Sequence, residues 1–143
     1  MPGSGRRRWG SFPTTADMGL WATGPSPAAL FEALGLGLVA LTTDLRRVRP
    51  RSQRELFARA DDPGALVVAW LGELLLLEQG EGFLAREIEV ELAGDPPNSL
   101  KARLRGELFD PERHPRRIEV KAATFHRLIV DLARGRARVI VDI

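Results

Sequence analysis

The stretch that decides the fold reads Glu87-Ile88-Glu89-Val90-Glu91-Leu92, then Gly94-Asp95-Pro96-Pro97-Asn98, then Leu100-Lys101-Ala102-Arg103-Leu104-Arg105-Gly106. Apolar and charged residues alternate in both arms, which places Ile88, Val90 and Leu92 on one face of a half-buried strand. The glycine and prolines between the arms are turn residues. The pattern therefore predicts an antiparallel hairpin. Outward from it, further strands are predicted at 18–22, 54–60, 118–124, 128–132 and 137–143.

Two helices are predicted before this hairpin. Ser26 and Pro27 form a helix start, with serine as N-cap and proline at the first helical position. Residues 28–42 are apolar at helical spacing, and Gly35 and Gly37 within them are tolerable if the helix packs closely on a sheet.

The second helix is predicted from its own start and stop signals. It starts at Asp61-Asp62-Pro63 and ends at Gly80 and Gly82. Together the elements predict an α+β fold, with two helices packed on a mostly antiparallel sheet. At 143 residues the chain is expected to form one domain, 1–143, with residues 1–8 as a flexible basic tail.

Composition excludes several classes of protein. The chain has no cysteine, so disulfides and thiolate chemistry are absent. No serine lies in a nucleophile elbow, and no phosphate-binding loop of the Walker type occurs. The apolar run Leu74-Leu75-Leu76-Leu77 is too short to cross a bilayer, and no apolar stretch follows Arg6-Arg7-Arg8 as in a signal peptide. We expect a cytoplasmic protein with no membrane contact.

Two lone carboxylates suggest a metal site. Asp17 adjoins one end strand and Asp142 lies in the other, Arg138-Val139-Ile140-Val141-Asp142-Ile143. If these strands pair, the carboxylates converge, and a hard cation with oxygen ligands would relieve their repulsion. The alternative is that each is an exposed carboxylate at a strand end, because no signature ligand spacing is present.

Histidine and arginine offer weaker candidates. His114 lies in a polar loop, where we expect it to be exposed or capping, and His126 lies near a strand end. A two-histidine site is conceivable, but structural histidines are favoured. The chain has 21 basic residues, a net charge of +2 and arginine clusters at 6–8, 46–51 and 113–117. These clusters could bind phosphate or could be solvated surface.

Taken in order, the segments resemble the archease family along almost the whole chain. The matching stretches are Thr15-Ala16-Asp17-Met18-Gly19-Leu20, Leu30-Phe31-Glu32-Ala33, Thr43-Asp44, Ala65-Leu66-Val67 with Trp70-Leu71, Glu73-Leu74-Leu75, Gly106-Glu107 with Asp110 and Arg113-His114, Glu119-Val120-Lys121-Ala122 with Thr124 and His126, and 137–143. No single stretch is decisive, and the order and spacing make the resemblance specific.

The resemblance implies an accessory protein and not an enzyme. Archeases activate the RNA-splicing ligase that joins a 3′-phosphate or cyclic phosphate end to a 5′-hydroxyl. They promote guanylylation of its active-site histidine, allow repeated turnover and can broaden the nucleotides accepted. By matching motif, the family's metal ligands fall on Asp17, Asp142 and the main-chain oxygens of Ile143, with calcium as the expected ion. Asp44 and Lys121 match polar positions nearby, and Lys121 could pair with the carboxylates or reach a phosphate on the partner.

One motif departs from the family pattern. Archeases usually have the sequence Asp-His-Thr-Ala-Asp where this chain has Pro13-Thr14-Thr15-Ala16-Asp17. The missing acid and histidine imply weaker metal binding or a different docking mode. Two other functions stay open: a basic RNA-binding module acting at RNA ends through its arginine clusters, and a metal-dependent hydrolase, which lacks an obvious general base. The sequence leaves the oligomeric state open.

Overall fold

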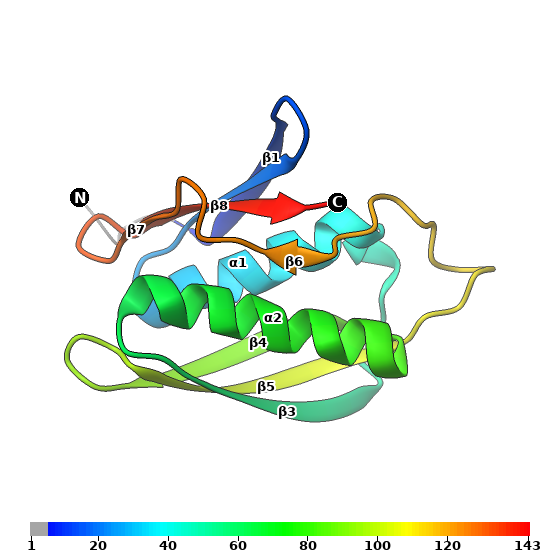
Figure 1. The fold of residues 1–143 in the computed structure, drawn as a ribbon. Coiled ribbons are helices and arrows are strands. Elements are labelled where there is room, and N and C mark those ends of the chain that lie inside the picture. The colour runs from blue at the N-terminus through cyan, green and yellow to red at the C-terminus, as the bar shows by residue number, and fades with distance from the viewer. Residues whose placement is uncertain (1–5) are drawn as a thin grey trace.

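The computed structural model describes residues 6–143 and arranges them in three layers, with two helices between two antiparallel sheets (Figure 1). The first sheet contains β1 (Arg8–Pro13), β2 (Met18–Thr23), β8 (Arg136–Asp142), β6 (Ala122–Ala123) and β7 (Ile129–Asp131). The second has the order β3 (Ser52–Arg59), β5 (Ser99–Leu108), β4 (Phe83–Ala93). The helices are α1 (Pro27–Thr42), α2 (Pro63–Glu81) and the short η1 (Leu45–Arg47). The predicted α+β class is confirmed, whereas the single sheet expected from the sequence is wrong.

The second sheet is needed because α1 is apolar on nearly every side, with Glu32 as its one charged residue. A helix that is hydrophobic all round must be covered all round. Its two central glycines face opposite layers: a Cβ on Gly35 would lie 2.8 Å from Ile88 Cδ1 of β4, and one on Gly37 would lie 2.7 Å from Leu20 Cδ1 of β2. The close packing expected at both glycines is therefore confirmed, and it occurs against two different sheets.

The second helix is fixed at both ends and tied to α1. Its N-cap Asp62 accepts a hydrogen bond from the Ala65 amide at 2.8 Å, and Gly82 ends it in the left-handed conformation at φ 74°. The buried Trp70 donates its indole N–H to the Phe31 carbonyl of α1 at 2.9 Å. The indole is thereby satisfied in the core.

The predicted hairpin is confirmed as β4 and β5. Ile88 lies opposite Leu104 and Leu92 lies opposite Leu100, so the apolar positions of both arms face the helices. Arg86 is a bulge residue, at the point where the register shifts between Ala85 and Glu87.

The first sheet joins segments far apart in the sequence. β2 pairs with β8, placing Leu20 opposite Val139 and Met18 opposite Val141. The strand predicted at 118–124 is wrong except at Ala122 and Ala123, because the preceding residues run beside the end of α1 and not along a strand. In the described part of the chain, no helix is long and apolar enough to cross a membrane.

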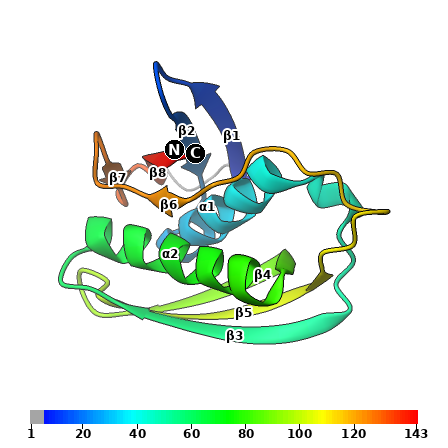
Figure 2. The ribbon, with the colours of Figure 1, turned by 45° about the vertical axis from the view of Figure 1, so that its right-hand side comes forward.

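The N-terminal strand β1 was not predicted. It pairs with β2 in a hairpin that projects beyond the rest of the molecule (Figures 1 and 2). The predicted tail is wrong at its inner end, since Arg8 begins β1 and Arg7 pairs with Glu32 of α1 at 3.0 Å. The remainder of that predicted tail, residues 1–5, lies outside the described residues.

Candidate functional site

Asp17 lies in the turn of the projecting β1–β2 hairpin. The turn is closed by two hydrogen bonds: the Thr14 amide donates to the Asp17 carbonyl oxygen at 3.2 Å, and the Asp17 amide donates to Thr14 Oγ1 at 3.0 Å. Thr14 thus fixes the backbone of Asp17. Asp17 is partly exposed, so its carboxylate remains open to a ligand or a partner.

Asp142 lies at the end of β8, beside this turn in the strand register. The β2–β8 pairing ends with Met18 opposite Val141, and Asp17 and Asp142 are the residues that directly adjoin this last pair. Successive side chains alternate between faces, and therefore both carboxylates belong to the face away from Leu20 and Val139. The predicted pairing of the end strands is confirmed. Ile143 follows with 43% of its surface exposed.

This oxygen set suits a hard cation only in part. Two carboxylates and main-chain oxygens are the ligand types that calcium accepts. Within residues 6–143, however, no group of three or more His, Cys, Asp or Glu residues could hold a metal ion. Pro13 and Thr14, which precede Asp17 in this turn, bring no carboxylate or imidazole ligand to it.

Asp44 has partners of its own. It caps η1 by accepting from the Arg46 amide, and both of its oxygens accept hydrogen bonds at 3.1 Å from the Arg46 guanidinium. Arg117 lies 3.9 Å away. The hydrogen bond from Arg46 is the main cause that lowers the pKa of Asp44, which keeps this carboxylate ionised.

The segment 117–121 links Asp44 to the chain end. Its Arg117 amide donates to the Thr42 carbonyl oxygen at 3.0 Å, and its Lys121 amide donates to the Asp142 carbonyl oxygen at 2.8 Å. Lys121 is exposed, and it directly precedes Ala122, the residue opposite Asp142 in the β6–β8 pair. The structure therefore brings the backbones of Lys121 and Asp142 together. Asp44 lies at the other end of this segment, beside Arg117.

Beside Asp17 the outer face of the first sheet is aromatic and basic. Phe12 lies opposite Gly19, and Trp21 lies opposite Gly10. A Cβ on Gly10 would lie 2.6 Å from the Trp21 indole, so each ring covers a glycine on the neighbouring strand. The Arg138 guanidinium lies 5.6 Å from the centre of the Phe12 ring, within range of a cation–π contact.

A depression of about 280 Å³ on this face includes Asp17 and His126. Its other lining residues are Phe12, Thr14, Thr15, Ala16, Arg127, Arg138 and Ile140. Sequence reasoning left His126 as a weak candidate and missed Phe12 and Arg138. The signal was the spacing Gly10-x-Phe12 and Gly19-x-Trp21, in which a small and a large residue alternate on the same face of paired strands.

His114 is structural. The expectation that it is exposed is wrong, because only 1% of its surface is accessible. Its Nδ1 accepts from the Asp110 amide at 2.9 Å, so its Nε2 carries the proton and donates to Glu107 at 2.9 Å. Glu107 also accepts from the Arg49 amide and from the Arg113 guanidinium. With His114 buried and partnered in this way, the two histidines do not form a common site.

A model of the Archease protein family (MTH1598/TM1083) matches residues 9–143 of the chain. The chain belongs to the archease family. It is 36% identical to the protein archease of Thermococcus gammatolerans over 126 residues, which cover 87% of this chain and 89% of that protein. It is 31% identical to the protein archease of Methanosarcina mazei over 147 residues, which span 100% of both.

Two solved structures share the archease fold. The solution structure of Methanobacterium thermoautotrophicum protein 1598 is 32% identical, with a TM-score of 0.80 over 94% of this chain and 98% of that one. The crystal structure of the Thermotoga maritima archease, described as a possible chaperone, has a TM-score of 0.53 at 18% identity and covers 92% of this chain and 94% of that one. The latter supports the fold alone.

Proposed function

We propose that this archease activates an RNA-splicing ligase by binding it while the ligase histidine is guanylylated, so that the ligase turns over repeatedly. The single observation that carries the proposal is the pairing of β2 with β8 in a chain of the archease family, because Asp17 and Asp142 directly adjoin its last pair, Met18 and Val141. The chain supplies a binding surface and not a catalytic centre. That role agrees with the description of the Thermotoga maritima archease as a possible chaperone.

The projecting β1–β2 hairpin would enter the ligase. Asp17 lies at its tip and Lys121 is exposed beside Asp142, so an acidic and a basic group meet at this edge. Lys121 would contact a phosphate on the ligase–nucleotide side, where a flexible ammonium acts as a point charge. Asp44, already held by Arg46, would position the segment that carries Lys121.

Asp17, Asp142 and the main-chain oxygens of Ile143 would hold a divalent ion, with calcium preferred. The ion's chemistry would be to neutralise two carboxylates that otherwise repel each other. Because this chain has Pro13 and Thr14 in place of the family's acid and histidine, its affinity for the ion would be weaker than that of archeases with the full motif.

The test is multiple-turnover RNA ligation by the cognate ligase with GTP and a divalent ion, with and without this protein. Activation should be lost in Asp17→Asn and Asp142→Asn and retained in the control Asp61→Asn, an exposed acid at the start of α2. Isosteric amides remove the charge and keep the shape. Full activation by both site variants would remove the role assigned to the carboxylates, and no activation by the native chain would remove the function.

RNA binding without activation is the second candidate. The observation in its favour is the outer face on which Phe12, Trp21 and Arg138 lie together, because aromatic rings with arginine can stack unpaired bases. Filter binding of single-stranded RNA at low and moderate salt tests it. Binding should weaken steeply with salt and on Phe12→Ala. Absence of RNA affinity at low salt would eliminate this function.

A further inference from the structure

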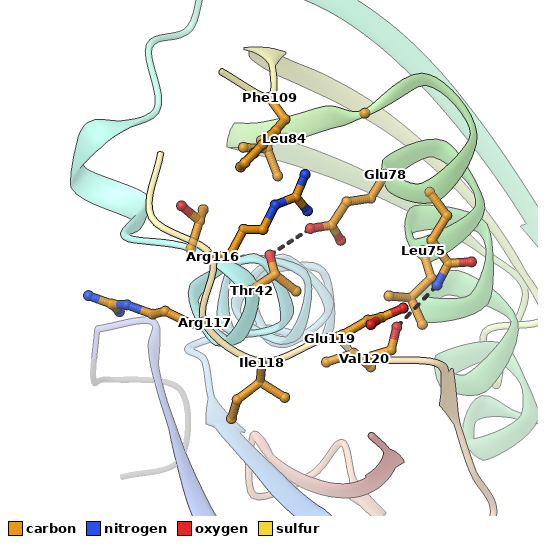
Figure 3. Close-up of a pocket in the computed structure, with 13 residues that line it drawn as sticks. Thr42, Leu75, Glu78, Leu84, Phe109, Arg116, Arg117, Ile118, Glu119 and Val120 are labelled. Carbon is orange, nitrogen blue, oxygen red and sulfur yellow. Dashed lines mark hydrogen bonds between the residues drawn. The ribbon is translucent and has the colours of Figure 1, made fainter. Parts of the chain in front are cut away.

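We propose that the cavity between the C-terminal ends of α1 and α2 binds a small organic cation, a primary amine or guanidinium on a short apolar stem. The cavity measures about 560 Å³, within the roughly 300–1,000 Å³ usual for small-molecule sites. It is separate from the Asp17 depression and shares no lining residue with it. Figure 3 shows it closed on one side by the segment that carries Arg116, Ile118 and Val120.

Two buried oxygen atoms at this cavity have no partner in the described chain. They are Oγ1 of Thr43, a residue with 1% of its surface exposed, and Oε2 of Glu78. Both residues line the cavity. Since buried polar atoms are nearly always hydrogen-bonded, these two call for a partner that the described chain does not supply, and the oxygen of an ionised Glu78 requires a donor.

The helix side of the cavity carries negative charge. Both helices end here, and neither has a basic residue in its last turn, so the negative ends of the two helix dipoles lack a compensating cation on the helices themselves. Glu78 adds a carboxylate, and burial raises its pKa to about 7 in spite of the hydrogen bond with Thr42 at 2.6 Å. An ammonium or guanidinium group would satisfy the free oxygens and favour the ionised carboxylate together.

The remaining walls fit an apolar stem. Leu75, Leu84, Ile118 and Val120 supply aliphatic surface, and Gln79 is tied back by its hydrogen bond to the Val120 carbonyl oxygen at 3.1 Å. A stem of a few methylenes buried against these side chains would be stabilised by its removal from water. The site therefore favours alkylamines and guanidines over a bare metal ion.

Arg116 limits entry. Its guanidinium stacks on the Phe109 ring at 4.1 Å from the ring centre, and in Figure 3 it extends over the cavity toward Glu78. It forms none of the ion pairs found among residues 6–143. A cation entering the site must pass this like charge. Arg117, by contrast, points away from the cavity in Figure 3 and lies 3.9 Å from Asp44.

The experiment compares n-butylamine, agmatine, n-butanol and butyrate by calorimetric titration, with a metal chelator present to keep the Asp17/Asp142 site out of the measurement. The pH is held above the pKa of about 7 of Glu78 so that the carboxylate is ionised. We expect saturable binding of both cations, weaker binding of butanol by about tenfold or more, and none of butyrate. Amide shifts of Thr43, Glu78 and Gly82 on titration locate the site.

Variants of opposite expected sign make the test specific. Glu78→Gln, which keeps the shape, should weaken amine binding about tenfold or more, whereas Arg116→Ala should tighten it by removing a like charge. Glu73→Gln on the same helix lies outside the cavity and should leave it unchanged. Thermal unfolding of each variant verifies that it is folded. Binding that survives Glu78→Gln, binding of butyrate lost in Arg116→Ala, or ordered water alone in an amine-soaked crystal would each overturn the proposal.

Discussion

Arg113 donates two parallel hydrogen bonds to the carboxylate of Glu107. They run from Nη1 to Oε1 at 2.8 Å and from Nη2 to Oε2 at 2.9 Å. The pair fixes the loop after β5 against the end of η1, because Nη2 also donates to the Arg47 carbonyl oxygen. Burial alone would raise the pKa of Glu107, and the bonds from Arg113, the Arg49 amide and His114 outweigh burial and lower it to about 2.

Removing Arg113 should therefore destabilise the fold strongly. Arg113→Ala leaves Glu107 with 7% of its surface exposed and without its main counter-charge, and we expect a loss of about 3 kcal/mol in the free energy of unfolding. Urea denaturation measures it. The control is Arg103→Ala, whose ion pairs at 3.9 and 3.7 Å are exposed and whose loss should cost less than about 1 kcal/mol. Equal losses in the two variants would contradict the prediction.

Glu78 should make stability fall as the pH rises. Its pKa of about 7 in the folded protein lies above the ordinary glutamate value of 4.5, so the folded state holds the proton more tightly. The stabilisation is lost as the pH rises from 4.5 to about 7. The expected loss is up to about 3 kcal/mol from the Glu78 carboxyl. Arg116, Arg117 and Glu119 are the other charged groups that line this cavity.

Urea denaturation of the native chain and of Glu78→Gln between pH 4.5 and about 7 tests this. The difference between their free energies of unfolding isolates the contribution of Glu78. The glutamine variant should lack this part of the slope. Glu107 acts in the opposite direction, because its lowered pKa makes stability fall as the pH drops from 4.5 toward about 2. A native slope identical to that of Glu78→Gln would show that Glu78 titrates normally.

Gly37→Ala should destabilise the helix that it would favour by propensity. The new Cβ would lie 2.7 Å from Leu20 Cδ1 and 2.9 Å from Trp9 Cβ, and overpacking of this kind costs about 1–3 kcal/mol. Gly72→Ala in α2 is the matched control, since its Cβ meets nothing within 4 Å and should stabilise by about 0.5–1 kcal/mol. Thermal unfolding of both variants should shift in opposite directions, and a shared direction would contradict the packing.

Calcium should raise the unfolding temperature of the native chain and not of Asp17→Asn. An ion that binds only the folded state stabilises it according to its concentration over its dissociation constant. Replacing Pro13 and Thr14 by the family's Asp and His should increase the shift. Magnesium at the same concentration serves as the ionic control, and equal shifts with and without Asp17 would place calcium elsewhere.

The sequence predicts those elements of the fold that depend on local residue patterns. The alternation around Ile88 defines the β4–β5 hairpin, and Ser26 and Asp62 correctly mark both helix starts. The sequence does not predict that α1 is covered by a sheet on each side, because the pattern of a short strand does not reveal which sheet the strand joins. β1 is not predicted because its residues alternate poorly, and the Trp21 ring that covers Gly10 comes from the neighbouring strand.

The candidate site divides in the same manner. Asp17 and Asp142 are predicted together because strand register fixes their neighbourhood, whereas the environment of a loop residue such as His114 depends on tertiary contacts. Glu78 could have been found. It continues the buried spacing of Leu71, Leu74 and Leu75 by one helical step, and a lone carboxylate on an apolar stripe is a signal.

The pairing of β2 with β8 has a consequence for synthesis in the cell. Residues 18–23 can complete their sheet only after residues 136–142 have left the ribosome, so this layer closes late and the contact has a high sequence separation. The β4–β5 hairpin, by contrast, needs only its own neighbours and can form earlier. Because Asp17 and Asp142 adjoin this late pairing, they can lie side by side only after residues 136–142 have paired with β2.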